Sequence, residues 1–139
     1  MHFDVVSFAA HEDAIRHIRH TVFTVEQMVD TTLDFDGLDD KAIQVLCTDQ
    51  GLPVGTGRML NDGHIGRVAV LREYRDKGVG AGLMKTLIET ARTRRFREVY
   101  LYAQVTAVPF YEKLGFEATG DNFTEAGILH TPMSLGLRP

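Results

Sequence analysis

The stretch RDKGVGAG, residues 75–82, combines residue types and spacing that suggest ligand chemistry. Glycines stand at every second position from Gly78 to Gly82, directly after Arg75 and Lys77. The apolar run VAVL comes before the stretch, and LMKTLIETA follows it with the apolar spacing of a helix. The N–H groups of a first helical turn have no partner within the helix, and together with the helix dipole they attract phosphate. The stretch therefore predicts a local site for a phosphate-bearing ligand.

Other glycine-rich motifs fit these residues poorly. A P-loop needs glycine directly before Lys-Ser or Lys-Thr, and here Met84 precedes Lys85. A dinucleotide fingerprint needs its glycines directly after the strand, whereas Gly78 stands well beyond Leu71. A turn without a ligand would account for one or two of the glycines, because each glycine costs about 0.5–1 kcal/mol in a regular element. A cradle for a pyrophosphate group accounts for all of them.

Composition argues against several classes of protein. The net charge of −4 argues against a nucleic-acid partner, so an anion site would have to be local. The 139 residues predict one domain, 1–139, and they contain no apolar run of about 18 residues, which argues against a membrane partner. One cysteine, Cys47, excludes internal disulfides and fits a cytoplasmic location. No Cys/His spacing indicates a metal site.

Apolar periodicity and turn signals predict an α/β or α+β fold with a sheet at its centre, in the order β-α-β-β-β-α-β-α-β-β. In the first helix, Ile15, Ile18, Val22 and Val25 recur at helical spacing. The acidic, turn-rich residues 30–40 predict a loop. Strands are expected at 3–8, 42–48, 53–60, 64–71, 98–103, 115–119 and 128–135, and helices from about Glu12, from Val79 and over 107–114.

Two motifs resemble those of a known family. The stretch VAVLREYRDKGVGAGLM is similar to the cofactor-binding motif of the GNAT superfamily, the acetyl-CoA-dependent N-acetyltransferases, with Arg75, Gly78 and Gly80 at its core. Further along, AVPFYEKLGF (107–116) resembles the second signature of the family. More weakly, VFTVEQ and EAGILHTPM resemble the ElaA-like proteins, a small bacterial branch. The resemblance implies a GNAT-like central sheet, mixed but mostly antiparallel and flanked by helices.

The family resemblance also implies a site for acetyl-CoA. The strand carrying Val68 and Val70 would splay from the strand at 98–103, and its backbone would pair with the pantetheine amides and polarise the thioester carbonyl. The N–H groups of residues 77–81 would hold the pyrophosphate. Gln104 stands where many members have Asn, so an amide is kept there. The implied cofactor-binding residues are Val68, Ala69, Val70, Arg75, Lys77, Gly78, Val79, Gly80, Ala81 and Gln104.

Transfer of an acetyl group to an amine needs a proton acceptor and a proton donor. An alkylamine with a pKa of about 10.4 must lose a proton at pH 7, and the leaving thiolate must gain one. Tyr111 matches the tyrosine that serves as the acid in the family; otherwise it is a core aromatic residue beside Phe110 and Phe116. Glu26, at the end of the first helix, is the candidate base; otherwise it is a solvated helix carboxylate.

Four other side chains are weaker candidates for the chemistry. His64 and His130 lie on predicted strands, where a lone histidine is more often structural than catalytic. Asp36 and Asp39 lie in the predicted loop and could attract a cationic amine, although loop carboxylates usually face water.

These residues together predict an N-acetyltransferase. The primary amine of a small molecule or peptide would attack acetyl-CoA directly in a ternary complex, with Tyr111 and Glu26 as the catalytic residues. The alternative is a non-catalytic CoA-binding sensor or interaction module on the same fold. The chain is expected to act as a monomer or a homodimer.

Overall fold

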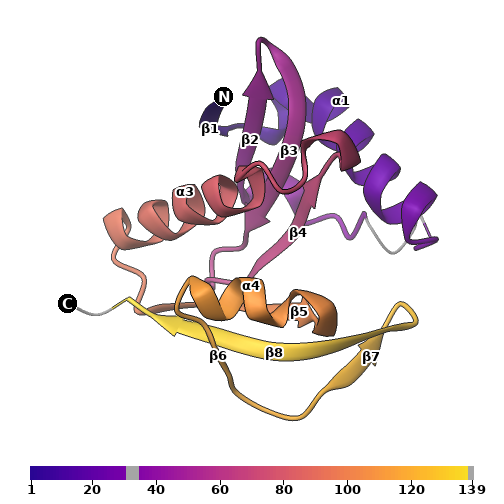
Figure 1. The fold of residues 1–139 in the computed structure, drawn as a ribbon. Coiled ribbons are helices and arrows are strands. Elements are labelled where there is room, and N and C mark those ends of the chain that lie inside the picture. The colour runs from indigo at the N-terminus through magenta and orange to yellow at the C-terminus, as the bar shows by residue number, and fades with distance from the viewer. Residues whose placement is uncertain (31–34, 138–139) are drawn as a thin grey trace.

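The computed structural model describes residues 1–30 and 35–137, which form helices and two sheets (Figure 1). The strands are β1 His2–Val6, β2 Ile43–Asp49, β3 Leu52–Met59, β4 Ile65–Val70, β5 Glu98–Gln104, β6 Glu117–Ala118, β7 Phe123–Glu125 and β8 Ile128–Gly136. The α-helices are α1 Phe8–Arg19, α3 Val79–Thr93 and α4 Val108–Lys113. The other helical segments are a π-helix, η1 His20–Glu26, and three short 3₁₀ turns, η2 Asp39–Lys41, η3 Arg72–Tyr74 and η4 Val105–Ala107.

The strands form two antiparallel sheets whose neighbouring edges diverge. One sheet has the order β1-β2-β3-β4, and the other has the order β5-β8-β6, with β7 also paired to β8. An isolated parallel bridge between His64 and Tyr100 joins the two sheets just before β4 begins. The predicted mixed fold, with mostly antiparallel strands and flanking helices, is confirmed. The structure divides the predicted sheet between β4 and β5 and adds the short strand β7, which the sequence did not indicate.

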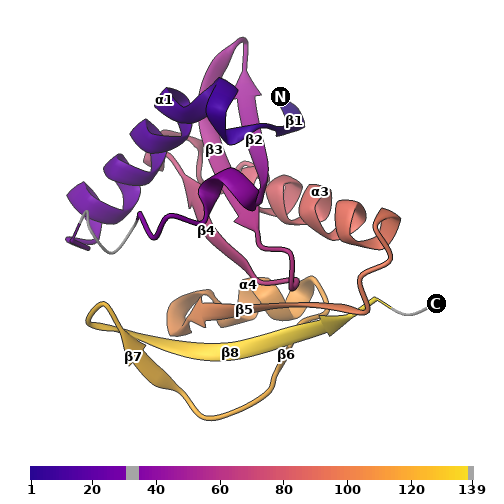
Figure 2. The ribbon, with the colours of Figure 1, turned by 180° about the vertical axis from the view of Figure 1, so that it is seen from behind.

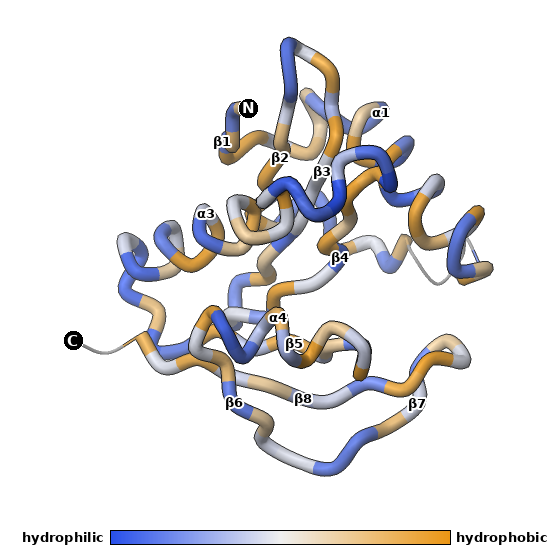
Figure 3. Tube along the Cα trace, viewed as in Figure 1, coloured by the Kyte–Doolittle hydropathy of each residue, from blue (hydrophilic) through white to orange (hydrophobic). Residues whose placement is uncertain are grey.

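Helices α3 and α1 cover opposite faces of the first sheet (Figures 1 and 2). The alternation of side chains along β2 decides which residue reaches which helix. Val45 and Cys47 share a buried cluster with α3, whereas Leu46 belongs to the cluster formed with α1. The hydrophilic connection between β4 and α3 stands out against these apolar elements in Figure 3. The core therefore holds both ends of that connection in fixed positions.

The first helix changes its pitch before it reaches the site. Ile15, Ile18 and Val22 are buried as predicted, but Val25, predicted on the same face, is 62% exposed. The cause is the π-helix η1, in which the N–H of Gln27 donates to the carbonyl of Val22, five residues earlier, at 3.2 Å. A π turn holds more residues than an α turn, so residues after Val22 are rotated from their α-helical positions.

A buried cluster of ion pairs fastens α1 and the loop before β2 to β3. Both terminal nitrogens of Arg19 donate to the carboxylate of Asp39, at 3.0 and 2.7 Å, and Arg19 is fully buried. Arg58 on β3 donates to Asp39 at 3.1 Å and also to Asp36. The suggestion that Asp36 and Asp39 attract a cationic amine is therefore wrong, because arginines of this chain already neutralise them. Residues 31–34 of the predicted loop lie outside the described residues.

The environment of Asp39 makes its charge important for stability. Burial raises its pKa, but the hydrogen bonds and the charge of Arg19, with the charge of Arg58, outweigh burial and lower it. A carboxylate whose pKa is lowered by folding contributes stability above its unfolded pKa of about 3.9, and this contribution is lost as the pH falls.

Among the described residues, no helix is long and apolar enough to cross a membrane.

We expect Asp39→Asn to lower the free energy of unfolding by about 3–5 kcal/mol at pH 7, because the substitution removes the carboxylate that pairs with buried Arg19 and leaves Asp36 as the carboxylate of Arg58. Urea unfolding measures the effect. Asp40→Asn, at the neighbouring exposed carboxylate, is the matched control and should change the free energy by no more than about 0.5 kcal/mol. The difference between wild type and Asp39→Asn should shrink as the pH falls from 6 to 3; equal losses in the two variants would contradict the cluster's role.

Candidate active site

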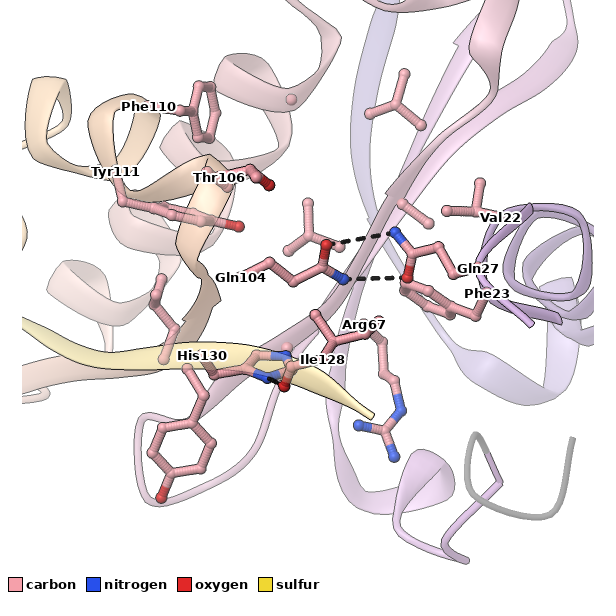
Figure 4. Close-up of a pocket in the computed structure, with 18 of the residues that line it drawn as sticks. Val22, Phe23, Gln27, Arg67, Gln104, Thr106, Phe110, Tyr111, Ile128 and His130 are labelled. Atoms are coloured by element: carbon pink, nitrogen blue, oxygen red, sulfur yellow. Dashed lines mark hydrogen bonds between the residues drawn. The ribbon is translucent and has the colours of Figure 1, made fainter. Parts of the chain in front are cut away.

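A cavity of about 770 Å³ occupies the gap between β4 and β5. Its walls come from η1, β4, the start of α3, β5, α4 and the β7–β8 hairpin (Figure 4). Both sheets and three helices therefore contribute residues to one space. Among the described residues, no group of three or more His, Cys, Asp or Glu side chains could hold a metal ion.

The wall formed by β4 is irregular at its middle. Thr56 pairs with Ala69 and Arg58 pairs with Gly66, so β4 has one residue more than β3 between these two pairs. The extra residue makes a β-bulge, and Arg67 takes up the turn with a φ of 51°. A bulge redirects backbone groups away from the ladder. On its other side, beyond the bridge at His64, β4 is not paired with β5, so its edge faces the cavity.

The start of α3 lies at one end of the cavity and presents backbone N–H groups. The first helical hydrogen bond runs from the N–H of Gly82 to the carbonyl of Gly78, at 3.0 Å. The N–H groups of Val79, Gly80 and Ala81 precede this bond and therefore have no acceptor within the helix. Gly80 also lines the cavity. This arrangement suits an anionic group of a ligand.

The structure gives a different reason for glycine at each of the three positions in this segment. Gly78 has a φ of 83°, a conformation that favours glycine, directly before the helix. A Cβ at Gly80 would lie 3.4 Å from the ring of Phe110. A Cβ at Gly82 would lie 2.2 Å from the ring of Phe3, so Gly82 allows α3 to pack closely on β1. Close packing therefore accounts for glycine at position 82, whereas the sequence indicates a pyrophosphate cradle formed by all three glycines.

Arg75 connects η1 to β4 at the same end of the cavity. Its terminal nitrogens donate to both carboxylate oxygens of Glu26 at 2.9 Å, and its Nε donates to the carbonyl of Val70 at 3.0 Å. Arg72 is a second, more distant partner of Glu26. The hydrogen bond from Arg75 is the main cause that lowers the pKa of Glu26. A carboxylate held in this way is a weak proton acceptor, so the geometry does not support the predicted role of Glu26 as base, and that role stays a prediction.

Tyr111 projects from α4 into the cavity, and its hydroxyl points toward Gln104 in Figure 4. Its ring contacts Phe110 and Phe116 edge to face, with centroids 5.0 and 6.0 Å apart. Burial raises the pKa of Tyr111 to about 12, so the phenol keeps its proton at neutral pH. The core and acid interpretations of Tyr111 are therefore compatible, because packing fixes the ring while the hydroxyl reaches the cavity.

The side chains of Gln27 and Gln104 form a hydrogen bond across the cavity. The sequence indicates a role at the site for Gln104 but not for Gln27. Gln104 Nε2 donates to Gln27 Oε1 at 3.0 Å, and a longer contact of 3.5 Å runs the other way (Figure 4). The pair lies between the end of the cavity at α3 and the end at β7–β8. The only sequence signal for Gln27 was its place in VFTVEQ, where the predicted α-helix gave no reason to prefer it to Glu26.

The other end of the cavity is rich in rings and has charges at its rim. His64, Tyr102 and His130 line it, with Glu125 from β7. Arg67 also lines this end but extends away from Tyr111 and pairs with Asp36 at 3.3 Å (Figure 4). Burial lowers the pKa of His64, so its ring is neutral at pH 7. This end can hold an organic acceptor beside the group that the other end would bind.

Most of the residues predicted to bind a cofactor line this one space. Those in the lining are Val68, Ala69, Val70, Arg75, Gly80 and Gln104, together with the predicted acid Tyr111. Those outside it are Lys77, Gly78, Val79 and Ala81 in the loop and helix start, and Glu26. The side chain of Val79 is fully buried in the core, so only its backbone could meet a ligand. Lys77 lies over the ring of Tyr74 at 5.5 Å.

Comparison with known proteins agrees with this arrangement. Residues 9–137 match a family model described as an acetyltransferase (GNAT) domain. An uncharacterized N-acetyltransferase of Bacillus subtilis (strain 168), YjcF, is 36% identical over 84% of this chain and 86% of its own length. The crystal structure of Escherichia coli ElaA has a TM-score of 0.86 and 28% identity, over 96% of this chain and 99% of that one.

A third similar protein is known from its crystal structure, an acyl-CoA N-acyltransferase from Pseudomonas aeruginosa. It has a TM-score of 0.85 and 27% identity, and the match covers 96% of this chain and 99% of that chain. The family model spans nearly all of the described residues, including both walls of the cavity. The chain therefore belongs to the GNAT acetyltransferase family.

Proposed function

We propose that this protein is an acetyl-CoA-dependent N-acetyltransferase in which the primary amine of a small molecule or peptide attacks the thioester directly in a ternary complex. The observation that carries the proposal is one cavity of about 770 Å³ that reaches from the start of α3 to the β7–β8 hairpin. Its volume falls in the range of small-molecule sites, which is about 300–1,000 Å³. It therefore has room for the acyl end of a donor and for an acceptor at the same time.

The donor would enter along β4. The unpaired edge of β4 can exchange hydrogen bonds with the amides of a pantetheine arm, since each backbone unit offers one donor and one acceptor. The N–H groups of Val79 to Ala81 can donate hydrogen bonds to a pyrophosphate, and Arg75 and Lys77 add positive charge nearby. A backbone N–H at the bulge beside Val68 would polarise the thioester carbonyl. The name of the Pseudomonas aeruginosa relative supports an acyl-CoA donor.

Tyr111 would supply the proton that the leaving thiolate needs. Its hydroxyl reaches the cavity, and burial keeps its pKa at about 12. A free thiol has a pKa of about 8.5, well below that of this phenol, so near neutral pH the phenol still carries the proton that the departing thiolate needs. The phenolate would regain a proton from the attacking nitrogen as the amide forms.

Calorimetric titration of acetyl-CoA into wild type and Gly80→Trp tests the donor site. We expect micromolar binding to wild type and none to the variant, because even a Cβ at this position lies 3.4 Å from Phe110 and an indole would fill the cavity end. Lys85→Trp is the matched control: it places the same bulk on the exposed side of α3, outside the cavity lining, and should bind normally.

The results separate the proposal from its rivals. Absence of binding of acetyl-CoA, CoA and longer acyl-CoAs to wild type would contradict the proposal. Binding followed by thiol release with a panel of alkylamines, arylalkylamines, polyamines and short peptides would support it. Binding without turnover of any amine would favour the CoA-binding module. Faster turnover of a longer acyl-CoA than of acetyl-CoA would identify that longer acyl-CoA as the donor.

We expect Tyr111→Phe to lower kcat about 100-fold while the dissociation constant of acetyl-CoA stays within about two-fold, because the ring contacts remain and only the acid is lost. Wild-type kcat should show no decline from loss of this proton up to about pH 10, because the acid works only below its pKa of about 12. Tyr100→Phe is the control, since its hydroxyl binds Asp62 outside the cavity lining. An unchanged kcat in Tyr111→Phe would rule out the acid role.

A further inference from the structure

The proposed acetyl transfer requires a group that removes a proton from the amine. At pH 7 an alkylamine is almost entirely an ammonium ion, and only the neutral nitrogen can attack. Glu26 is occupied by Arg75 and lies outside the lining. A side chain at the β7–β8 end that has a free lone pair directed into the cavity could receive the proton instead.

The ring of His130 is held in one tautomer by a backbone contact. Its Nδ1 lies 2.7 Å from the carbonyl oxygen of Ile128, two residues earlier on β8 (Figure 4). A carbonyl oxygen only accepts hydrogen bonds, so Nδ1 must carry the hydrogen when this contact is made. In the neutral ring, Nε2 is then the nitrogen with a free lone pair, and it can take up one proton.

Packing fixes the position of the same ring beside the proposed reaction centre. His130 stands opposite Gln104 in the β5–β8 ladder, and both side chains line the cavity. On its other side the ring stacks on Phe123 of β7, with centroids 5.8 Å apart and planes 20° apart. These contacts leave the imidazole half-buried at the cavity wall rather than free in solvent.

The other titratable groups at this end are less suited to the task. His64 stacks flat on Tyr100, 4.7 Å between centroids, and burial lowers its pKa, which makes it a weaker base. Glu125 is exposed on β7, and Arg67, which is paired with Asp36, accepts no proton. Among the described residues, Tyr102 on β5 is a further titratable side chain that lines this end of the cavity.

We propose that Nε2 of His130 is the general base that receives the proton lost by the acceptor ammonium ion, which rests on the proposed acetyl transfer. One N–H bond of the ammonium breaks, and its proton moves to Nε2. The neutral nitrogen forms a bond to the thioester carbon, and the carbon–sulfur bond then breaks. Tyr111 gives its proton to the sulfur and regains one from the new amide nitrogen. His130 finally releases its proton to water, so each cycle yields amide, free thiol and one proton.

His130→Asn is the variant that separates a base from a structural residue. The asparagine amide nitrogen can still donate to the carbonyl of Ile128, but it has no lone pair in place of Nε2. With the panel amine that wild type acetylates fastest, we expect kcat/KM at pH 7 to fall about 100-fold. The loss should shrink as the pH approaches the amine pKa of about 10.4, where free amine forms without a base. His17→Asn, on the exposed side of α1, is the matched control and should match wild type.

Two further measurements complete the test. Added 4-methylimidazole should restore activity to His130→Ala, and other imidazoles should do so in the order of their basicity. Long-range ¹H–¹⁵N spectra of wild type, which need no acceptor, should show hydrogen on Nδ1 and none on Nε2 in the neutral ring. The opposite tautomer, or a His130→Asn variant that keeps wild-type kcat/KM across the pH range, would overturn the assignment. Failure of acetyl-CoA to bind would instead refute the acetyl transfer itself.

Discussion

The divergence of β4 from β5 is the constraint on which the rest of the site depends. Two neighbouring parallel strands would ordinarily satisfy each other's backbone groups along their whole length. Here they share a bridge at His64 and Tyr100 and then separate, while the bulge at Arg67 redirects the β4 backbone. The edge of β4 is left facing a cavity instead of a partner strand. Backbone groups in such a position require another hydrogen-bonding partner, and an extended ligand rich in amides can provide it.

The π-helix η1, which continues α1, forms one side of the gap between β4 and β5. The buried pairing of Arg19, Asp39 and Arg58 fastens the end of α1 and the turn η2 to β3. Arg75 then links η1 to the end of β4 through Glu26 and the carbonyl of Val70. Because these contacts hold η1 at both of its sides, Gln27 is delivered to the middle of the cavity. Charged groups that look like surface residues in the sequence thus shape an uncharged contact inside the site.

The sequence predicted the elements around the gap well and the side-chain partnerships poorly. Local patterns suffice for the helix start at Gly78 and for the aromatic packing of Tyr111, because both depend on neighbours in the chain. The π-helix could not be foreseen, since its extra residue per turn leaves no mark on the apolar spacing before Val22. The pairing of Asp36 with Arg58 and the contact between Gly82 and Phe3 join residues distant in sequence. Only the folded chain shows them.

The contact between Gln27 and Gln104 bears on which ligands the cavity can accommodate. Two primary amides hold each other there, through a hydrogen bond of 3.0 Å and a longer contact of 3.5 Å. An incoming molecule with its own amide can replace either glutamine with a group of the same polarity, so the number of hydrogen bonds is conserved in the exchange. Separating the two glutamines therefore costs little free energy when the ligand carries an amide. An apolar ligand would instead leave both side-chain amides without hydrogen-bonding partners. The contact therefore favours a ligand that carries an amide over an apolar one before any chemistry begins.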